Sequence, residues 1–173
     1  MEQERLRIYT IDMKYILNLA NVDDNVLSVS PQIHKDTRPF VGIIIICDQK
    51  KYCVPLSSHK AKHQNMRNDV DFTKIIYNGQ LIGVLNFNNM IPVNDTVVQP
   101  IDLNITKTDT PEDRHYKELL MNQQTFCQQN QDAIVKKANK LYTLITTGKA
   151  NSYLKRRCCN FTKLEDVLAK WHT

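Results

Sequence analysis

The feature that most constrains the fold of this chain is a change of hydrophobic pattern near residue 110. Before it, short apolar runs rich in β-branched residues alternate with polar turns, as strands do. After it, apolar residues recur at helical spacing, as at Ile134, Ala138 and Leu141. Strands followed by helices predict an α+β fold. The 173 residues should form a single domain, residues 1–173, with a β-barrel core over about 6–102 and a helical part over about 111–171.

Local signals place the strands. The continuously apolar run Phe40–Cys47 predicts a buried strand, and Asn78-Gly79 predicts a type I′ turn joining Phe72–Tyr77 to Gln80–Phe87. Further strands are expected at Leu6–Ile11, Lys51–Leu56 and Val97–Asp102, the last at a sheet edge. We therefore expect a compact, highly bent antiparallel β-barrel.

Capping signals place the helices. Asp12 is the expected N-cap of a short helix Met13–Ala20, and Thr110-Pro111 opens the first helix of the second half. Further boundaries are expected at the polar run Gln128–Asp132, at Gly148 and at a capping box Thr162–Glu165 that opens a helix to about Lys170. The fold should thus carry one early helix and two or three C-terminal helices.

The charge of the chain is unevenly distributed. The net charge is +5, but the acid-free segments Lys50–Arg67 and Lys136–Arg157 carry +5 and +7, so the rest carries −7. This polarity suits a polyanion such as a nucleic acid, because each neutralised phosphate releases counterions. The alternative is that both segments are solvated faces.

Other signals are weak or absent. The N-terminus lacks the apolar stretch of a secretory signal, and the longest apolar run is too short to span a bilayer, so we expect a cytoplasmic protein without membrane contact. The five cysteines should be reduced thiols; Cys158 and Cys159 could also bind a soft metal or oxidise, but they have no nearby partners. His59 and His63 lack a third zinc ligand, so neither a metal nor a cofactor is expected.

The loop after the second predicted strand carries the densest chemistry. It combines hydroxyl groups, lysines and histidines over Ser57–His63, without a carboxylate that could complete a Ser-His-Asp triad. Cleavage of RNA without a metal needs a group that helps deprotonate the 2′-OH, a group that protonates the leaving oxygen, and cations that stabilise the phosphorane. This loop could supply all three, although it could equally be a solvated turn.

Several segments in order carry a family resemblance: Ile8–Ile11 running into Lys14–Ile16, Phe40–Ile43, Val54–Lys60, Gly83–Phe87 and Met90–Val93. Their order and spacing resemble the ToxN/AbiQ family of endoribonuclease toxins of type III toxin–antitoxin systems, across essentially the whole chain. Within that family the chain looks most similar to the CptN group.

The resemblance implies a MazF/Kid-like, SH3-like barrel and a metal-independent endoribonuclease that leaves a 2′,3′-cyclic phosphate and a 5′-OH. It implies an antitoxin made of small repeat RNA pseudoknots, which the toxin processes and which then inhibits it in a closed protein–RNA assembly. Release during phage infection would expose cellular and phage mRNA to cleavage, mostly at A-rich sites, and cause abortive infection. DNA is not an expected partner.

Residues of this chain take up roles through the same resemblance. Ser57, Ser58 and Lys60 match the family's catalytic loop: Ser58 would lie at the scissile phosphate, and Lys60 would stabilise developing charge or act as the acid. Tyr15 matches an active-site tyrosine, although a core position is an equal alternative. Where relatives carry Tyr and Lys, this chain has His34, which could act as acid or base, and Arg38, which can only clamp phosphate.

RNA binding is assigned to a wider set of residues. It comprises His63, Lys62, Phe72, Lys149, Lys155, Arg156 and Arg157. Phe72 could stack on a base or belong to the strand core. Lys149 and the cluster Lys155–Arg157 would contact the antitoxin through its phosphates and shape.

Two other classes of function compete. A non-catalytic RNA-binding or translational control module would use the same basic segments. A protein-binding SH3-like module would leave the two acid-free segments unexplained.

Overall fold

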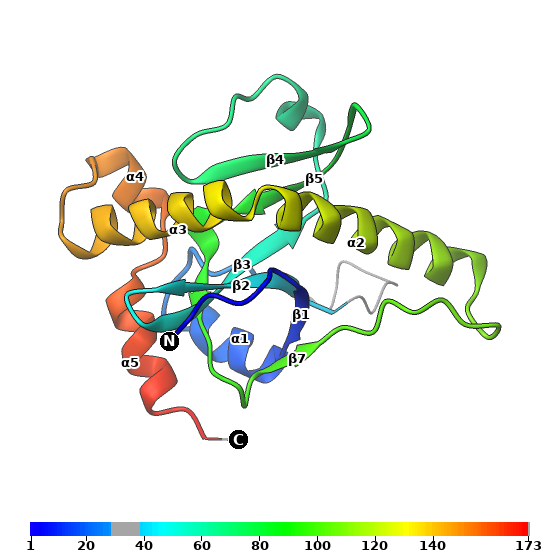
Figure 1. The fold of residues 1–173 in the computed structure, drawn as a ribbon. Coiled ribbons are helices and arrows are strands. Elements are labelled where there is room, and N and C mark those ends of the chain that lie inside the picture. The colour runs from blue at the N-terminus through cyan, green and yellow to red at the C-terminus, as the bar shows by residue number, and fades with distance from the viewer. Residues whose placement is uncertain (29–38, 173) are drawn as a thin grey trace.

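The computed structural model describes residues 1–28 and 39–172, and the fold given below is that of these residues. Its strands form a seven-stranded sheet in the order β4-β5-β3-β2-β1-β7, with β6 paired to β3 beside this path (Figure 1). Every strand pairing is antiparallel. The strands are β1 (Ile8–Ile11), β2 (Val41–Cys47), β3 (Lys50–Ser57), β4 (Phe72–Tyr77), β5 (Gln80–Asn86), β6 (Ile91–Pro92) and β7 (Val98–Pro100).

Strand β3 produces the bend of the sheet. Its residues up to Pro55 pair with β2, whereas Leu56 and Ser57 pair with Leu85 and Val84 of β5. The strand thus passes from one half of the sheet to the other, and its carboxyl end emerges where the halves meet. The expected α+β fold with a highly bent sheet is confirmed, but in the described part of the chain no ladder joins the end strands β4 and β7 into a closed barrel.

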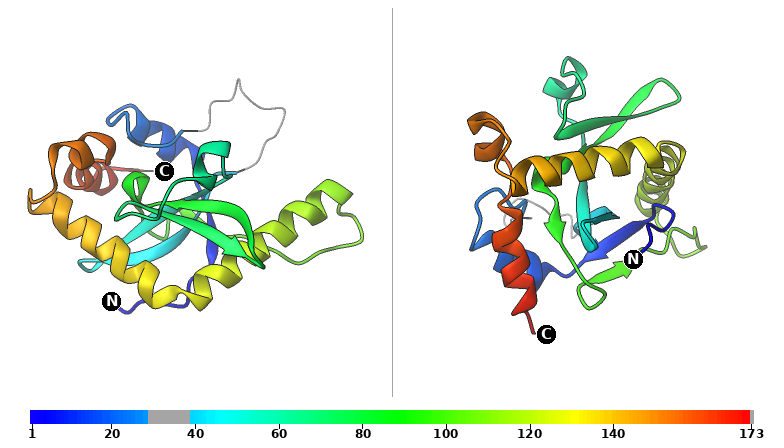
Figure 2. Two further views of the ribbon diagram at one scale, coloured as in Figure 1. Left: turned by 90° about the horizontal axis from the view of Figure 1, so that it is seen from above. Right: turned by 60° about the vertical axis from the view of Figure 1, so that its left-hand side comes forward.

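The helices are α1 (Met13–Ala20), α2 (Pro111–Gln129), α3 (Gln131–Thr146), α4 (Ser152–Arg157) and α5 (Phe161–Ala169), and Ala61–Gln64 and Phe87–Asn89 form the 3₁₀ turns η1 and η2. Helices α2 and α3 follow one another along the sheet (Figures 1 and 2). Two glutamines of α2 bind strand backbone: Gln124 Oε1 accepts from Ile8 N at 3.0 Å, and Gln123 Nε2 donates to Ile82 O at 2.8 Å. These amides satisfy strand groups that would otherwise lie unpaired under the helices.

Most local signals of the sequence are confirmed. Asn78 and Gly79 have φ angles of 50° and 74°, as a type I′ turn requires. The Asp12 side chain caps α1 by accepting from Lys14 N at 2.8 Å. Helix α2 begins at Pro111, and Gly148, with φ of 70°, follows the C-cap of α3.

The C-terminal helices differ from the prediction in two details. Four α-helices lie in the described part of the chain after residue 110, rather than two or three, because the six residues of α4 form a separate helix capped by Asn151. Helix α5 is capped by Asn160, whose Oδ1 accepts from Lys163 N at 3.2 Å, and not by Thr162. The last residue of the expected capping box, Glu165, instead accepts hydrogen bonds from the hydroxyls of Tyr52 and Tyr142.

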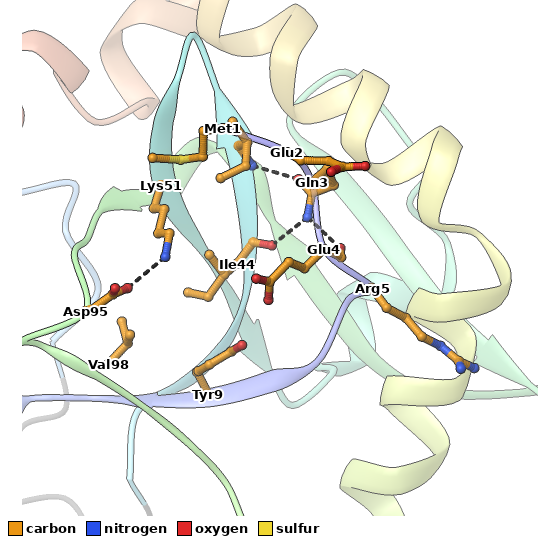
Figure 3. A pocket seen from close by; sticks show the side chains of 11 residues that line it. Met1, Glu2, Gln3, Glu4, Arg5, Tyr9, Ile44, Lys51, Asp95 and Val98 are labelled. Carbon is orange, nitrogen blue, oxygen red and sulfur yellow. Dashed lines mark hydrogen bonds and ion pairs between the residues drawn. The ribbon is translucent and has the colours of Figure 1, made fainter.

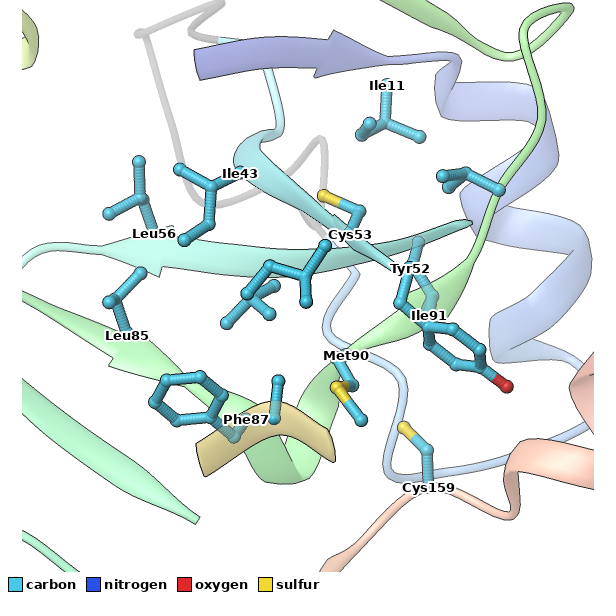
Figure 4. Close-up of a cluster of buried hydrophobic side chains, with 14 of the residues drawn as sticks. Ile11, Ile43, Tyr52, Cys53, Leu56, Leu85, Phe87, Met90, Ile91 and Cys159 are labelled. Carbon is cyan, nitrogen blue, oxygen red and sulfur yellow. The ribbon is translucent and has the colours of Figure 1, made fainter. Parts of the chain in front are cut away.

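The core lies between the bent sheet and its helices. Ile43, Tyr52, Leu85 and Phe87 are fully buried there and pack with further apolar side chains of β1, β3 and β6 (Figure 4). The Tyr52 ring lies edge-on to Phe161 at 5.5 Å between centroids, so α5 joins the same core. This packing fixes β3 and leaves the loop that follows it exposed.

Candidate active site

The predicted catalytic loop leaves the sheet at the carboxyl end of β3. Ser57 is half-buried and still paired in the sheet, whereas Ser58, His59 and Lys60 are exposed. The 3₁₀ turn η1 follows immediately and brings the chain back toward β4. The loop therefore presents a hydroxyl group and a cation to solvent from a rigid strand end.

A circuit of contacts holds both ends of this loop. Asn86 Nδ2 of β5 donates to Ser57 Oγ at 2.7 Å, and Asn86 is the register partner of Phe72 in β4. The Phe72 ring stacks on the His63 ring with centroids 5.3 Å apart and an interplanar angle of 27°. His63 Nδ1 accepts from the backbone N–H of Lys60 at 2.7 Å, which closes the circuit. The structure thus brings together Ser57, Lys60, His63 and Phe72 from the predicted set.

The environment of His63 favours the neutral imidazole. Its side chain is 7 % exposed, and burial together with the positive charges of Lys62, Lys60 and His59 holds its pKa below the ordinary value. With Nδ1 accepting a hydrogen bond, the remaining proton belongs on Nε2.

Helix α3 supports the circuit from behind. Lys137 Nζ donates to Thr73 Oγ1 at 2.7 Å and to Phe72 O at 3.4 Å. Burial lowers the pKa of this lysine, against the opposing effect of Asp69 and Asp71. Lys137 and Asn86 were missed by the sequence reasoning, because their importance comes from partners on other elements.

Arg157, a predicted RNA contact, takes part in an ion pair within the protein. Its Nε donates to Asp71 Oδ2 at 2.5 Å, and its guanidinium lies 4.2 Å from the ring centroid of Tyr153. The side chain of Asp71 is only 6 % exposed and that of Arg157 29 %, so a buried carboxylate is paired with a partly exposed guanidinium. Arg157 thus ties α4 to the residue before β4, whereas the neighbouring Lys155 and Arg156 are exposed, as are Lys149 and Lys62.

Tyr15 has a structural role in this arrangement. It is fully buried, its hydroxyl donates to Pro92 O at 2.5 Å, and its ring packs edge-on to Trp171. Burial raises its pKa well above the usual range. A side chain with no exposed surface cannot touch RNA in this conformation, so we leave Tyr15 out of the proposed site. His34 and Arg38 lie outside the described residues and stay predictions.

The cysteines and histidines give no metal site in the described residues. No group of three or more His, Cys, Asp or Glu side chains in residues 1–28 and 39–172 is arranged to hold a metal ion. All five cysteines are buried and unpaired. Burial raises the pKa of the Cys158 thiol to about 12 and that of Cys159 still further, so both stay protonated at neutral pH.

A hollow of about 600 Å³ lies elsewhere, beneath the N-terminal residues (Figure 3). Its lining mixes both signs of charge, and Lys51 is bound to Asp95 at 2.7 Å. None of the predicted site residues lines it. Within the described ranges, no helix is both long and apolar enough to cross a bilayer.

The fold and the loop together define a class: an α+β protein with a bent antiparallel sheet whose central strand ends in a hydroxyl- and cation-bearing loop. Comparison with known proteins then gives the family. The family described as "Toxin ToxN, type III toxin-antitoxin system" matches residues 7–169. The chain therefore belongs to the ToxN family of type III toxin–antitoxin toxins, and the resemblance seen in the sequence is confirmed.

Two curated relatives support this assignment. The chain is 32 % identical over 165 residues to the endoribonuclease ToxN of Pectobacterium atrosepticum, covering 93 % of this chain and 91 % of that protein. It is 34 % identical over 165 residues to the endoribonuclease ToxN of Bacillus thuringiensis subsp. kurstaki, covering 92 % and 81 %.

Two solved structures share the fold. Both are 30 % identical to this chain with a TM-score of 0.77, and both cover 96 % of it and nearly all of their own chain (98 % and 99 %). One of these structures concerns selective toxin inhibition by a non-coding RNA pseudoknot. The other concerns a bacterial antiviral system that is regulated by a processed non-coding RNA.

Proposed function

We propose that this toxin is an endoribonuclease that cuts RNA at the loop Ser57–His63 by transesterification, without a metal ion. The 2′-oxygen attacks the adjacent phosphorus as its proton leaves, and the bond from phosphorus to the 5′-oxygen breaks as that oxygen takes up a proton. The products are a 2′,3′-cyclic phosphate and a 5′-OH end. Negative charge accumulates on the phosphorane oxygens, so a nearby cation lowers the barrier.

The exposure of each side chain indicates which of these roles it can take. Ser58 and Lys60 are exposed, so they can contact the scissile phosphate: Ser58 orders the 2′-OH or a phosphate oxygen, and Lys60 stabilises the developing charge. Ser57 keeps its own hydroxyl proton to donate, because its oxygen accepts from Asn86. The single observation that carries the proposal is this pairing of an exposed hydroxyl and an exposed cation on a loop fixed at both ends.

The proposed inhibitor is a repeat RNA folded as a pseudoknot, held in a closed protein–RNA assembly. Lys149, Lys155 and Arg156 are exposed cations in the acid-free segment Lys136–Arg157. A surface of this kind suits recognition of RNA through its phosphates. The proposed substrates are cellular and phage mRNA in the cytoplasm. Freed during phage infection, the toxin would stop growth and act in defence by abortive infection.

The test is RNA cleavage in excess EDTA with mapping of the product ends. Wild type should cleave and leave a 2′,3′-cyclic phosphate, while Ser58→Ala and Lys60→Met should each lose at least about 100-fold in rate. Lys107→Met is the matched control, because Lys107 is an exposed lysine far along the chain, before α2. Cleavage that requires a divalent metal would overturn the mechanism, and full activity of both loop variants would remove the loop from it.

A further inference from the structure

One contact in the loop plays no part in the proposed reaction. The reacting groups are Ser58 and Lys60, but the backbone of Lys60 is held by His63 in two ways. The Lys60 N–H donates to His63 Nδ1 at 2.7 Å, and the His63 N–H donates to Lys60 O at 2.9 Å. The loop is thus closed on itself across four residues, and one of the two closing bonds ends on an ionisable ring.

The ring that makes this bond is held in place by the sheet. Phe72 stacks on it from the first position of β4, and Phe72 is itself 8 % exposed. The ring therefore cannot turn to offer its other nitrogen without losing this packing. The position of Lys60 relative to the end of β3 depends on an imidazole fixed by β4.

We propose that His63 is a positioning residue, which holds Lys60 beside Ser58 through its Nδ1 acceptor and does so only while its imidazole is uncharged. This inference rests on the proposed role of the loop. The reason lies in the hydrogen-bonding groups of the ring. An imidazolium has two N–H donors and no acceptor, so protonation of Nδ1 places a proton against the Lys60 N–H. That bond then breaks, and Lys60 is held only by the remaining bond from the His63 N–H to the Lys60 carbonyl.

The surrounding charges all act in one direction. The groups that bear on His63 are Lys62 and Lys60 of its own segment and His59 before them, and each disfavours the imidazolium. Phe72 brings no charge from β4, and Asp71 beside it is engaged by Arg157. Since the pKa of His63 is lowered in the folded protein, the unfolded chain binds the proton more readily. Both the loop geometry and this contribution to stability are present above the ordinary histidine pKa of about 6.5 and are lost as pH falls through the lower folded value.

Two variants separate the acceptor from the ring. His63→Asn keeps an acceptor near the position of Nδ1 but cannot be protonated, and His63→Phe keeps a ring against Phe72 but has no acceptor. On a short A-rich RNA cut by wild type, we expect His63→Asn to stay within about threefold of wild type at pH 7.5. His63→Phe should lose at least about tenfold in kcat with KM nearly unchanged, because the lost bond positions a reacting group rather than binding RNA.

The pH profile is the decisive readout. The ratio of His63→Asn to wild-type kcat should rise as pH falls from 7.5 to the lowest pH at which both proteins stay folded, because only wild type loses its loop geometry to protonation. Urea unfolding of each variant at pH 7.5 ensures that rates are compared between folded proteins. A constant ratio, or a wild-type rate for His63→Phe, would overturn the inference. Full activity of Ser58→Ala and Lys60→Met in the same assay would instead show that the proposed function of the loop is at fault.

Discussion

Asp71 shows how a single residue outside the chemistry can hold the site together. Its carboxylate binds Arg157, while its backbone carbonyl accepts from the N–H groups of Phe87 and Asn88 at 3.1 and 3.3 Å. Phe72, the next residue, stacks on His63. One buried acid thus joins the basic helix α4, the turn η2 and the stacking partner of the loop.

The Asp71–Arg157 pair makes a prediction about stability. Arg157→Met leaves a buried carboxylate without its partner, so it should lower the free energy of unfolding by about 2–3 kcal/mol. Asp71→Asn/Arg157→Met removes both charges and should recover part of that loss. Urea unfolding at pH 7 measures both, with Arg156→Met as the matched control because Arg156 is exposed. Equal stability of Arg157→Met and the control would show that the pair contributes nothing.

The sequence singles out the residues of the loop but not the residues that support it. Ser57, Ser58 and Lys60 are singled out by residue type and family resemblance, because they lie within four positions of one another. The partners that hold them come from far along the chain: Asn86 is 29 residues from Ser57, and Arg157 is 86 residues from Asp71. Neither pairing leaves a local pattern, so the sequence shows the positive charge of Arg157 but not its carboxylate partner, and it does not single out Asn86.

At the scale of elements, the sequence predicts those turns and helix starts that neighbouring residues determine. The Asn78-Gly79 turn and the Thr110-Pro111 start of α2 depend on backbone angles and caps that neighbouring residues set. The predicted capping box of α5 does not form, because Glu165 binds residues from other elements. Its carboxylate contacts Tyr52, Tyr142 and Lys50. Helix α4 was missed because six residues are too few to show a helical period.

The close approach of β2 and β3 gives a prediction at this scale. A Cβ atom on Gly42 would meet the Sγ of Cys53 and would lie 2.5 Å from the carbonyl oxygen of Val54. Because that carbonyl is backbone, the strands must separate, and Gly42→Ala should lose about 2–3 kcal/mol of unfolding free energy. Adding Cys53→Ala should restore only part of it, since the carbonyl remains. A Gly42→Ala protein as stable as wild type in urea would contradict this close packing.

At the scale of the whole molecule, the two acid-free segments of the sequence serve different purposes. The first carries the exposed Lys60 and Lys62 of the loop, but Lys50 binds Glu165 at 3.3 Å and Lys51 binds Asp95. The second carries Lys137 and Arg157, which are engaged inside the protein, and Lys155 and Arg156, which are not buried. Charge counted along the sequence therefore overstates the charge available to RNA.

This distinction decides which residues test the proposed antitoxin surface. Neutralising Arg157 would confuse lost binding with lost stability, so the proper variant is Lys155→Gln/Arg156→Gln, in a Ser58→Ala background that leaves the RNA uncut. If each cation contacts a phosphate, the slope of log Kd against log salt concentration for the repeat RNA should become shallower by about 1.5.

The control for that measurement is Lys107→Gln/Lys170→Gln, which changes the net charge equally at exposed positions outside α3 and α4. It should leave the slope unchanged, because long-range charge alone releases no counterions from specific phosphates. Cleavage of a short RNA by Lys155→Gln/Arg156→Gln with Ser58 intact should stay at the wild-type rate, since the loop is untouched. A slope that both charge variants change equally would mean that the antitoxin responds to overall charge and not to a surface on α4.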